Sequence, residues 1–250
     1  HTVALDRAGN LYIADTGNHR VRKVDAAGII RTIAGTGKTE PATDVGKALT
    51  AALRFPRGVA VDDEGAVYIA DTGHSGIRKV GKDGKIALIC GGDAVELKKA
   101  GIPVYLQTPL GTVIGLDGQV YWADSLLNRV KKADPNKRDP ATRLGWVVIV
   151  AGVGEQGDGG DGGSALEANL NEPAALAFDR QGNLYMADHG NNRIRMVDAK
   201  TGNISTVAGN GERGFSGDGG LAANAQLNAP SGLAVDDHGA LYIADAGNHR

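Results

Sequence analysis

The stretch Leu11-Tyr-Ile-Ala-Asp-Thr-Gly-Asn-His-Arg-Val-Arg-Lys-Val-Asp25 decides the fold, because its core returns four more times along the chain. The Tyr-x-Ala-Asp motif stands at Tyr12–Asp15, Tyr68–Asp71, Tyr121–Asp124, Tyr185–Asp188 and Tyr242–Asp245. The five tyrosines are 56, 53, 64 and 57 residues apart. Such a recurrence is typical of a repeat architecture with one supersecondary unit per period. We therefore expect one quasi-repetitive domain over residues 1–250, in which each unit buries its apolar faces against its neighbours.

One repeat can be divided into four strands. In the last copy, Gly232–Asp236 is a short apolar run, Asp237–Gly239 is a turn signal, and Ala240–Ala244 follows as a second strand. The preceding copy supplies a third strand at Arg193–Asp198 and a fourth at Ile204–Ala208. Four antiparallel strands make one blade, which cannot cover its own faces, so several blades have to pack around an axis. The pattern predicts an all-β propeller.

The repeated segments resemble NHL repeats of the bacterial type. Besides the opening stretch, Pro56-Arg-Gly-Val-Ala-Val-Asp62 and Thr32-Ile-Ala-Gly-Thr-Gly37 carry the resemblance, which covers nearly the whole chain. The matching motifs are Leu11–Asp25, Val67–Val80, Val120–Asp134, Leu184–Asp198 and Leu241–Arg250. The resemblance implies a propeller, most often of six blades. The blades are expected at about 1–35, 56–91, 109–152, 173–209 and 230–250, the last incomplete, so we expect four and a half blades of a truncated ring.

Composition and charge exclude several classes of protein. The net charge is −2, with 27 basic and 29 acidic side chains, so no global field favours a nucleic acid or an anionic membrane surface. No run of about 18 apolar residues is present that could span a bilayer. The single Cys90 excludes an internal disulfide framework and a cysteine-rich metal site, and we expect it as a small apolar residue in a strand Ile86–Cys90.

The aspartate that ends each Tyr-x-Ala-Asp motif is followed five residues later by an arginine in four copies. The pairs are Asp15 with Arg20, Asp124 with Arg129, Asp188 with Arg193, and Asp245 with Arg250, whereas the second copy has Gly76. Seven residues after the same aspartate stand Arg22, Arg78, Lys131 and Arg195. A basic ring is one interpretation, since animal NHL proteins similar to these repeats can bind RNA. Repetition in successive blades instead favours structural ion pairs between adjacent strands.

Four histidines fall in the turn between the second and third strands of a blade, which places them at one common end that we call the loop face. They are His19, His74, His189 and His249. Zinc needs three or four ligands about 2 Å from one ion, whereas equivalent turns of successive blades are well separated. We predict no zinc site, and we treat these histidines and Asn192 as candidate ligand contacts on the loop face.

Two glycine-rich loops, Gly152–Gly163 and Gly209–Gly220, carry Asp158, Asp161 and Asp218. Calcium takes six to eight oxygens, and neither loop has the spacing of known calcium loops. Because aspartate and glycine suit helix starts, we interpret the loops as caps of short helical turns within Ser164–Leu170 and Leu221–Leu227. Their acidic residues remain candidate loop-face contacts.

The connections that diverge most between blades are Gly91–Pro109, which contains Val95–Ala100, and the charged insertion Asp134–Gly145 between a third and a fourth strand. A fixed scaffold with divergent loops is where recognition usually lies. We therefore predict a non-catalytic binding or scaffold module that recognises a protein or a small molecule through its loop face. We expect it within a larger bacterial chain or assembly that is extracellular, periplasmic or surface-bound, without membrane insertion and without nucleic acid as a partner.

The alternative function is that of a metal-dependent lyase or lactonase with its site in the axial channel. Peptidyl-hydroxyglycine amidating lyase and the gluconolactonases are similar propellers with metal ligands near the axis. The segments that lead into the first strands are Phe55–Gly58, Thr108–Gly111, Glu172–Ala175 and Ala229–Gly232, and none contains histidine. They are mostly Arg, Leu, Ala and Ser, so we predict no cofactor; calcium and zinc are the open alternatives.

Overall fold

The computed structural model describes residues 2–42, 45–92, 106–140 and 144–250. The first blade consists of β1 (Val3–Leu5), β2 (Leu11–Asp15), β3 (Arg20–Val24) and β4 (Ile30–Ala34). The second has β6 (Pro56–Val61), β7 (Val67–Asp71), β8 (Gly76–Val80) and β9 (Lys85–Gly91), together with β5 (Val45–Lys47). The third has β10 (Pro109–Ile114), β11 (Val120–Asp124), β12 (Arg129–Arg138) and β13 (Gly145–Ala151). The fourth has β14 (Pro173–Phe178), β15 (Leu184–Asp188), β16 (Arg193–Val197) and β17 (Ile204–Ala208), and the fifth has β18 (Pro230–Val235) and β19 (Leu241–Asp245).

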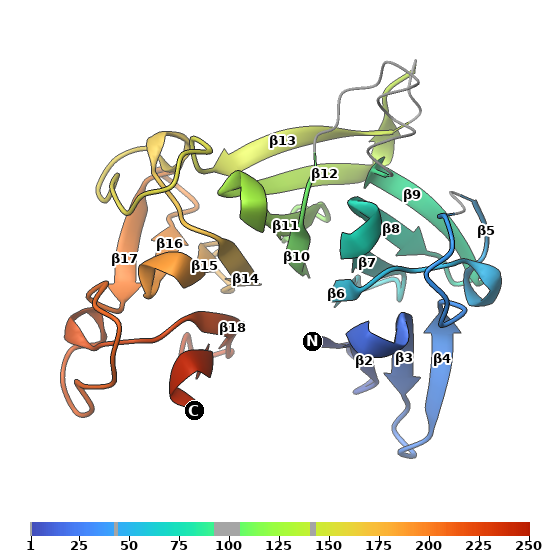
Figure 1. Cartoon of the computed structure of the whole chain (residues 1–250), viewed down its shortest axis with the longest axis horizontal. Helices are drawn as coiled ribbons and strands as arrows, with labels where there is room; N and C mark the ends of the chain where they lie inside the picture. The colour runs from blue at the N-terminus through green and yellow to red at the C-terminus, as the bar shows by residue number, and fades with distance from the viewer. Residues whose placement is uncertain (1, 43–44, 93–105, 141–143) are drawn as a thin grey trace. The chain divides into compact units, whose positions relative to one another are not determined.

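Within each sheet the order of the blade's own strands follows the sequence, so each strand pairs with the next one along the chain (Figure 1). The predicted all-β propeller architecture is confirmed, with four full antiparallel blades and two strands of a fifth. The second blade departs from the pattern, because β5 adds a fifth strand at its edge, where Val45 lies opposite Ala87 of β9. Nothing in the repeat indicates this additional strand.

The chain divides into two compact units, each of which is described by itself. The first contains His1–Tyr121 and Lys132–Val148, and the second contains Trp122–Lys131 and Ile149–Arg250. The expectation of one domain over residues 1–250 stays a prediction.

Short 3-10 helices close the turns between the second and third strands. These are η1 (Thr16–Asn18), η3 (Thr72–His74), η4 (Ser125–Leu127), η6 (His189–Asn191) and η8 (Ala246–Asn248), and the connections between blades hold η2 (Ala48–Thr50), η5 (Ala165–Glu167) and η7 (Ala222–Asn224). A left-handed residue ends each of the five turn helices, namely His19, Ser75, Asn128, Asn192 and His249, with φ between 48° and 58°. One such residue lets the chain reverse immediately into the third strand.

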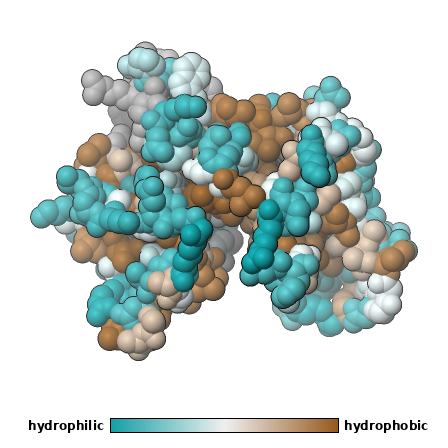
Figure 2. Space-filling model, turned by 180° about the vertical axis from the view of Figure 1, so that it is seen from behind, coloured by the Kyte–Doolittle hydropathy of each residue, from teal (hydrophilic) through white to brown (hydrophobic). Residues whose placement is uncertain are grey.

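Alternation along the strands builds the core. In β2, Tyr12 and Ala14 are buried between less buried neighbours, whereas all five residues of β7 are buried, because apolar side chains cover both of its faces. Ile69 of β7 and Leu53 join the core of the first unit. In the second unit, Ala175, Ala187, Ile194, Ala208 and Leu227 form a buried cluster. Hydrophobic and hydrophilic side chains are both exposed on the surface seen from behind (Figure 2).

Two divergent segments behave differently from the repeat. The first part of the predicted charged insertion Asp134–Gly145 continues strand β12 as far as Arg138, so that this third strand has ten residues where its counterparts have five. Most of the Gly91–Pro109 connection, including Val95–Ala100, lies outside the described residues. Cys90 is buried in β9. No helix in the described part of the chain is both long and apolar enough to cross a bilayer.

Candidate functional site

The repeat aspartates form ion pairs with the basic residue seven positions later. Carboxylate-to-nitrogen distances are 2.8 Å for Asp71 and Arg78, 2.7 Å for Asp124 and Lys131, 3.4 Å for Asp188 and Arg195, and 3.7 Å for Asp15 and Arg22. The register explains this geometry, because Arg22 lies opposite Ile13 and is therefore a diagonal neighbour of Asp15 on the same face of the sheet.

The predicted pairs with the arginine five residues later need correction. Asp15–Arg20 and Asp188–Arg193 are opposite each other in register, but these arginines, like Arg129, donate to carbonyl oxygens of the following connection. The donor and acceptor pairs are Arg20 with Thr36, Arg129 with Val153, and Arg193 with Asn210, at 3.0, 2.6 and 3.1 Å. Arg250 stacks on the Phe215 ring at 3.6 Å, and no ion pair joins it to Asp245 among the described residues.

Glycines explain why these arginines turn toward the connection. A Cβ at Gly37 would lie 2.7 Å from Arg20 Nη2, and a Cβ at Gly211 would lie 2.6 Å from Arg193 Nη2. Glycine leaves this space, so the Ala-Gly-x-Gly segment after the fourth strand of the first, third and fourth blades forms the cradle of the arginine. The signal was present in the sequence as a repeated glycine.

The repeat aspartates also bind the backbone that leads into the first strand of their own blade. Oδ1 of Asp71, Asp188 and Asp245 accepts the N–H of Arg54, Asn171 and Asn228 respectively, in each case at 2.7 Å. Burial raises the pKa of Asp188, and the hydrogen bonds from Asn171 and Asn191 and the Arg195 guanidinium act in the opposite direction. Each carboxylate is a structural junction within its blade.

Two of the predicted ligand contacts, His19 and Asn192, form hydrogen bonds with the next blade. His19 Nδ1 accepts the N–H of Phe55 at 3.1 Å, and the two rings meet edge to face with centroids 4.5 Å apart. In the second unit, Oδ1 of Asn128 and Asn192 accepts the N–H of Glu172 and Ala229, at 2.9 Å each. Since a backbone N–H can only donate, His19 carries its hydrogen on Nε2.

His189 and His74 are likewise held in the scaffold. His189 Nδ1 is 3.1 Å from the carbonyl oxygen of Pro230. In the first two blades a threonine takes the place of this histidine: Thr16 donates to the carbonyl oxygen of Pro56, and Thr72 donates to that of Pro109. His74 is only 4% exposed and lies between two acceptors, Asp71 Oδ2 at 2.8 Å and the Glu40 carbonyl oxygen at 3.1 Å.

His249 is exposed at the end of η8. The structure therefore holds His19, His74, His189 and His249 in separate turns. Nowhere in the described residues could a group of three or more His, Cys, Asp or Glu side chains hold a metal ion.

All three acidic residues of the glycine-rich loops are exposed, and two of them are paired with arginines. Asp161 lies 2.7 Å from Arg195 and Asp158 lies 3.3 Å from Arg193. The helical turns expected here are the 3-10 helices η5 and η7. The side chain of Ser164 caps η5 by accepting the N–H of Leu166.

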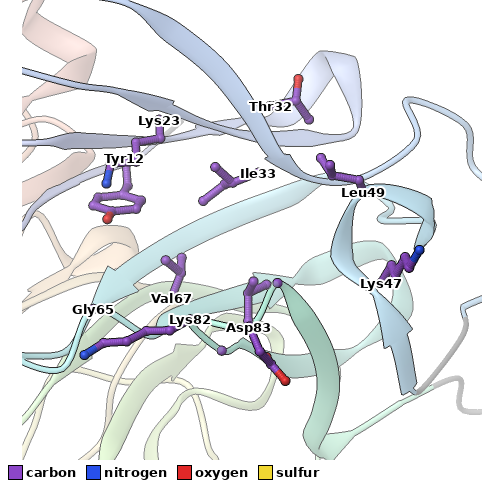
Figure 3. Close-up of a pocket in the computed structure, with 13 residues that line it drawn as sticks. Tyr12, Lys23, Thr32, Ile33, Lys47, Leu49, Gly65, Val67, Lys82 and Asp83 are labelled. Carbon is purple, nitrogen blue, oxygen red and sulfur yellow. The ribbon is translucent and has the colours of Figure 1, made fainter. Parts of the chain in front are cut away.

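A pocket of about 600 Å³ in the first unit lies between the first two blades (Figure 3). Its lining residues come from β2, β3 and β4, from the connection around β5, and from the β6–β7 and β8–β9 turns with the strand ends beside them. They are Tyr12, Lys23, Thr32, Ile33, Lys47, Leu49, Gly65, Val67, Val80, Gly81, Lys82, Asp83 and Gly84. Sequence reasoning missed this site, because Lys47, Leu49 and Lys82 belong to no repeated motif.

A second pocket of about 460 Å³ in the same unit is more polar. Arg7 lies 2.6 Å from Asp63, and the Tyr68 hydroxyl donates to Asp62 Oδ2 at 3.2 Å. Burial raises the pKa of Tyr68, and the nearby Asp62 acts in the same direction.

Comparison with known proteins agrees with the repeat. Residues 37–104 and 112–214 match the model of the teneurin NHL domain, and residues 1–24 and 227–250 match the NHL repeat. The chain is 34% identical over 210 residues to Protein SUPPRESSOR OF QUENCHING 1, chloroplastic, of Arabidopsis thaliana, and 33% identical over 289 residues to teneurin-4 of Mus musculus. These alignments cover 79% and 97% of this chain but only 19% and 10% of the two relatives.

A solved structure also has this fold. A structural genomics protein of unknown function from Bacteroides thetaiotaomicron superposes with a TM-score of 0.71 over 99% of this chain and 56% of that chain, at 19% identity. At this identity, the likeness is one of fold.

Proposed function

Since the chain belongs to the NHL-repeat propellers, in the family of the teneurin NHL domain, we propose that it is a non-catalytic binding module within a larger chain. Its mouse teneurin-4 relative is a chain of which this sequence covers 10%. The partner is a protein or a small ligand that meets the loop face, and the location is extracellular or periplasmic. Catalysis needs groups that are free to act, and the histidines and aspartates of the turns are mostly engaged in the scaffold.

One observation carries this proposal. An arginine contacts the same position of both glycine-rich loops, but the loop residue at that position differs. In the first loop Arg193 meets Asp158, whereas in the second loop Arg250 meets Phe215. Phe215 is 46% exposed, so the loop presents an aromatic ring backed by a guanidinium. Exposed aromatic and arginine side chains are enriched at recognition surfaces. The scaffold therefore stays constant while the exposed chemistry of its loops changes.

A peptide-display selection on the whole chain tests this proposal. Phe215→Asp installs the residue found at the equivalent position of the preceding loop, so the variant should fold normally. We expect the selected peptides to bind this variant at least tenfold more weakly than the wild type. Trp146→Ala removes another exposed aromatic residue, in β13, and should leave peptide binding unchanged.

Two results would contradict the proposal. Peptides that bind Phe215→Asp normally and fail on Trp146→Ala would place recognition away from the loop face. A stoichiometric metal found by elemental analysis, together with lyase or lactonase turnover, would replace the binding module with an enzyme.

A further inference from the structure

The pocket between the first two blades lies at the other end of the strands from the loop face. Strand β8 begins at the loop-face helix η3 and ends at Val80, and the turn Gly81–Gly84 that follows lines the pocket. The pocket is thus separate from the surface assigned to recognition above, and what it binds is independent of that assignment. Its volume falls within the range of small-molecule sites.

The middle of the pocket is apolar. Figure 3 shows Ile33 of β4 and Val67 of β7 facing each other across it, with Leu49 beside Ile33. Val67 is almost fully buried in the core, whereas Leu49 is 59% exposed. Covering Leu49 with an apolar ligand is favourable by about 25 cal/mol per Å² of buried area.

The charges around this apolar middle are unbalanced. Three lysines, Lys23, Lys47 and Lys82, line the pocket with one carboxylate, Asp83. That carboxylate lies 3.4 Å from Lys85, which is not part of the lining.

Among the described residues, no ion pair involves Lys47 or Lys82. Lys23 differs, because its amine lies 4.0 Å from Asp6 and 5.1 Å from the centre of the Tyr12 ring. The charge available to a ligand therefore comes from Lys47 and Lys82.

Strand register adds an independent sign of missing negative charge. β5 pairs with β9 so that Lys47 lies directly opposite Lys85. Like charges directly opposite each other on neighbouring strands are destabilising, and Asp83 is the only carboxylate of the lining. Asp83 lies 3.4 Å from Lys85, so the excess positive charge of the pocket is that of Lys47 and Lys82.

We propose that this pocket binds a small amphipathic anion, with an apolar body between Ile33, Val67 and Leu49 and an anionic group paired with Lys82. Lys82 extends toward the side of the pocket where Tyr12 lies, and Lys47 stands at the other side (Figure 3). Lys82 therefore fixes the anionic end, and Lys47 contributes less. A carboxylate on a chain of about eight carbons has the required size and charge.

Isothermal titration calorimetry with octanoate tests the proposal on the whole chain. We expect saturable binding that weakens with added salt. Lys82→Gln should raise the dissociation constant about threefold to fivefold, and Lys47→Gln should raise it about twofold, in keeping with one exposed ion pair each. Lys200→Gln makes the same change of net charge at an exposed lysine of the second unit and should have no effect.

Matched ligands separate charge from apolar contact. Octyltrimethylammonium and octanol have the same chain without the negative charge, so both should bind at least fivefold more weakly than octanoate. Equal binding of the cation, or equal losses in Lys82→Gln and Lys200→Gln, would overturn the proposal. Sedimentation with phosphatidylglycerol vesicles that is lost in Lys82→Gln would also overturn it, because the lysines would then contact a membrane surface. Each of these results leaves the loop-face experiment unaffected.

Discussion

The first two blades meet differently at their two ends. At the loop face, His19 accepts the Phe55 N–H and Thr16 donates to the Pro56 carbonyl oxygen, so that side chains of one blade bind the backbone of the next. At the opposite end the same blades part around a pocket whose lining includes residues outside the repeat, among them Lys82. Polar residues of the turns therefore hold the blades together at the loop face. At the pocket end, a lysine outside the repeat offers its charge to a ligand.

The largest effect should come from removing a buried carboxylate at the loop face. Asp71 is fully buried and binds Arg54, His74 and Arg78. Asp71→Ala should lower the free energy of unfolding by about 3–5 kcal/mol, because it leaves buried donors and a guanidinium without their partner. Asp83→Ala at the pocket end removes an exposed carboxylate and should change stability little. Urea unfolding of both variants measures the difference in their free energies of unfolding. Equal losses of stability would refute the proposed contrast between the loop face and the pocket end.

A second comparison uses two glycines with nearly the same backbone conformation. Gly91 at the loop face has φ 74°, and Gly84 at the pocket end has φ 72°. A Cβ at Gly91 would collide with the Ser75 carbonyl oxygen, whereas a Cβ at Gly84 meets nothing within 4 Å. Alanine should cost about 1 kcal/mol at Gly84 from backbone strain, and about 1–3 kcal/mol more at Gly91 from overpacking. Thermal unfolding that ranks the two variants in the other order would show that the loop face adapts more easily than we infer.

The inter-blade bond of His19 should be replaceable by the asparagine used in other blades. His19→Asn keeps an acceptor for the Phe55 N–H, as Asn128 and Asn192 do for their own partners, and should leave stability nearly unchanged. His19→Ala removes the acceptor and should cost about 1 kcal/mol. Chemical denaturation distinguishes the two variants. An asparagine variant as unstable as the alanine variant would mean that ring packing on Phe55, and not the hydrogen bond, carries the effect.

The smallest effect at neutral pH concerns the repeat tyrosines. Burial raises the pKa of Tyr12, Tyr68 and Tyr121 above the ordinary value of 10.0. Because the folded pKa lies above the unfolded one, the associated stability is fully present below about pH 10 and is lost as pH rises through the folded pKa. Urea unfolding should therefore show a steeper loss between pH 9 and pH 11 in the wild type than in Tyr68→Phe. Parallel curves would show that Tyr68 does not contribute to this loss.

The blades could be predicted from the sequence because each depends on a local period. Arg193–Val197 and Ile204–Ala208 lie where the third and fourth strands were expected. The ion-pair partner of Asp15 could not be predicted from the sequence in the same way, because Arg20 and Arg22 are both neighbours of Asp15 on the adjacent strand. Arg20 instead occupies the space beside Gly37.

The pocket could not be predicted from the sequence for a different reason. The β5 strand Val45–Lys47 has no repeated pattern, and its pairing with β9 follows from the path of one connection. Lys47 and Lys82 are far apart in sequence, and the pocket that they line forms only where the first blade packs beside the second.

One measurement tests most directly whether the loop face holds the blades together while the pocket end binds a ligand. It is the stabilisation of the fold by octanoate. A ligand that binds the folded state raises the free energy of unfolding by an increment set by its dissociation constant. We predict that His19→Ala lowers stability in the absence of octanoate and keeps the wild-type increment, whereas Lys82→Gln keeps the wild-type stability and loses most of the increment. The reverse pattern, with the increment lost in His19→Ala and kept in Lys82→Gln, would contradict the account.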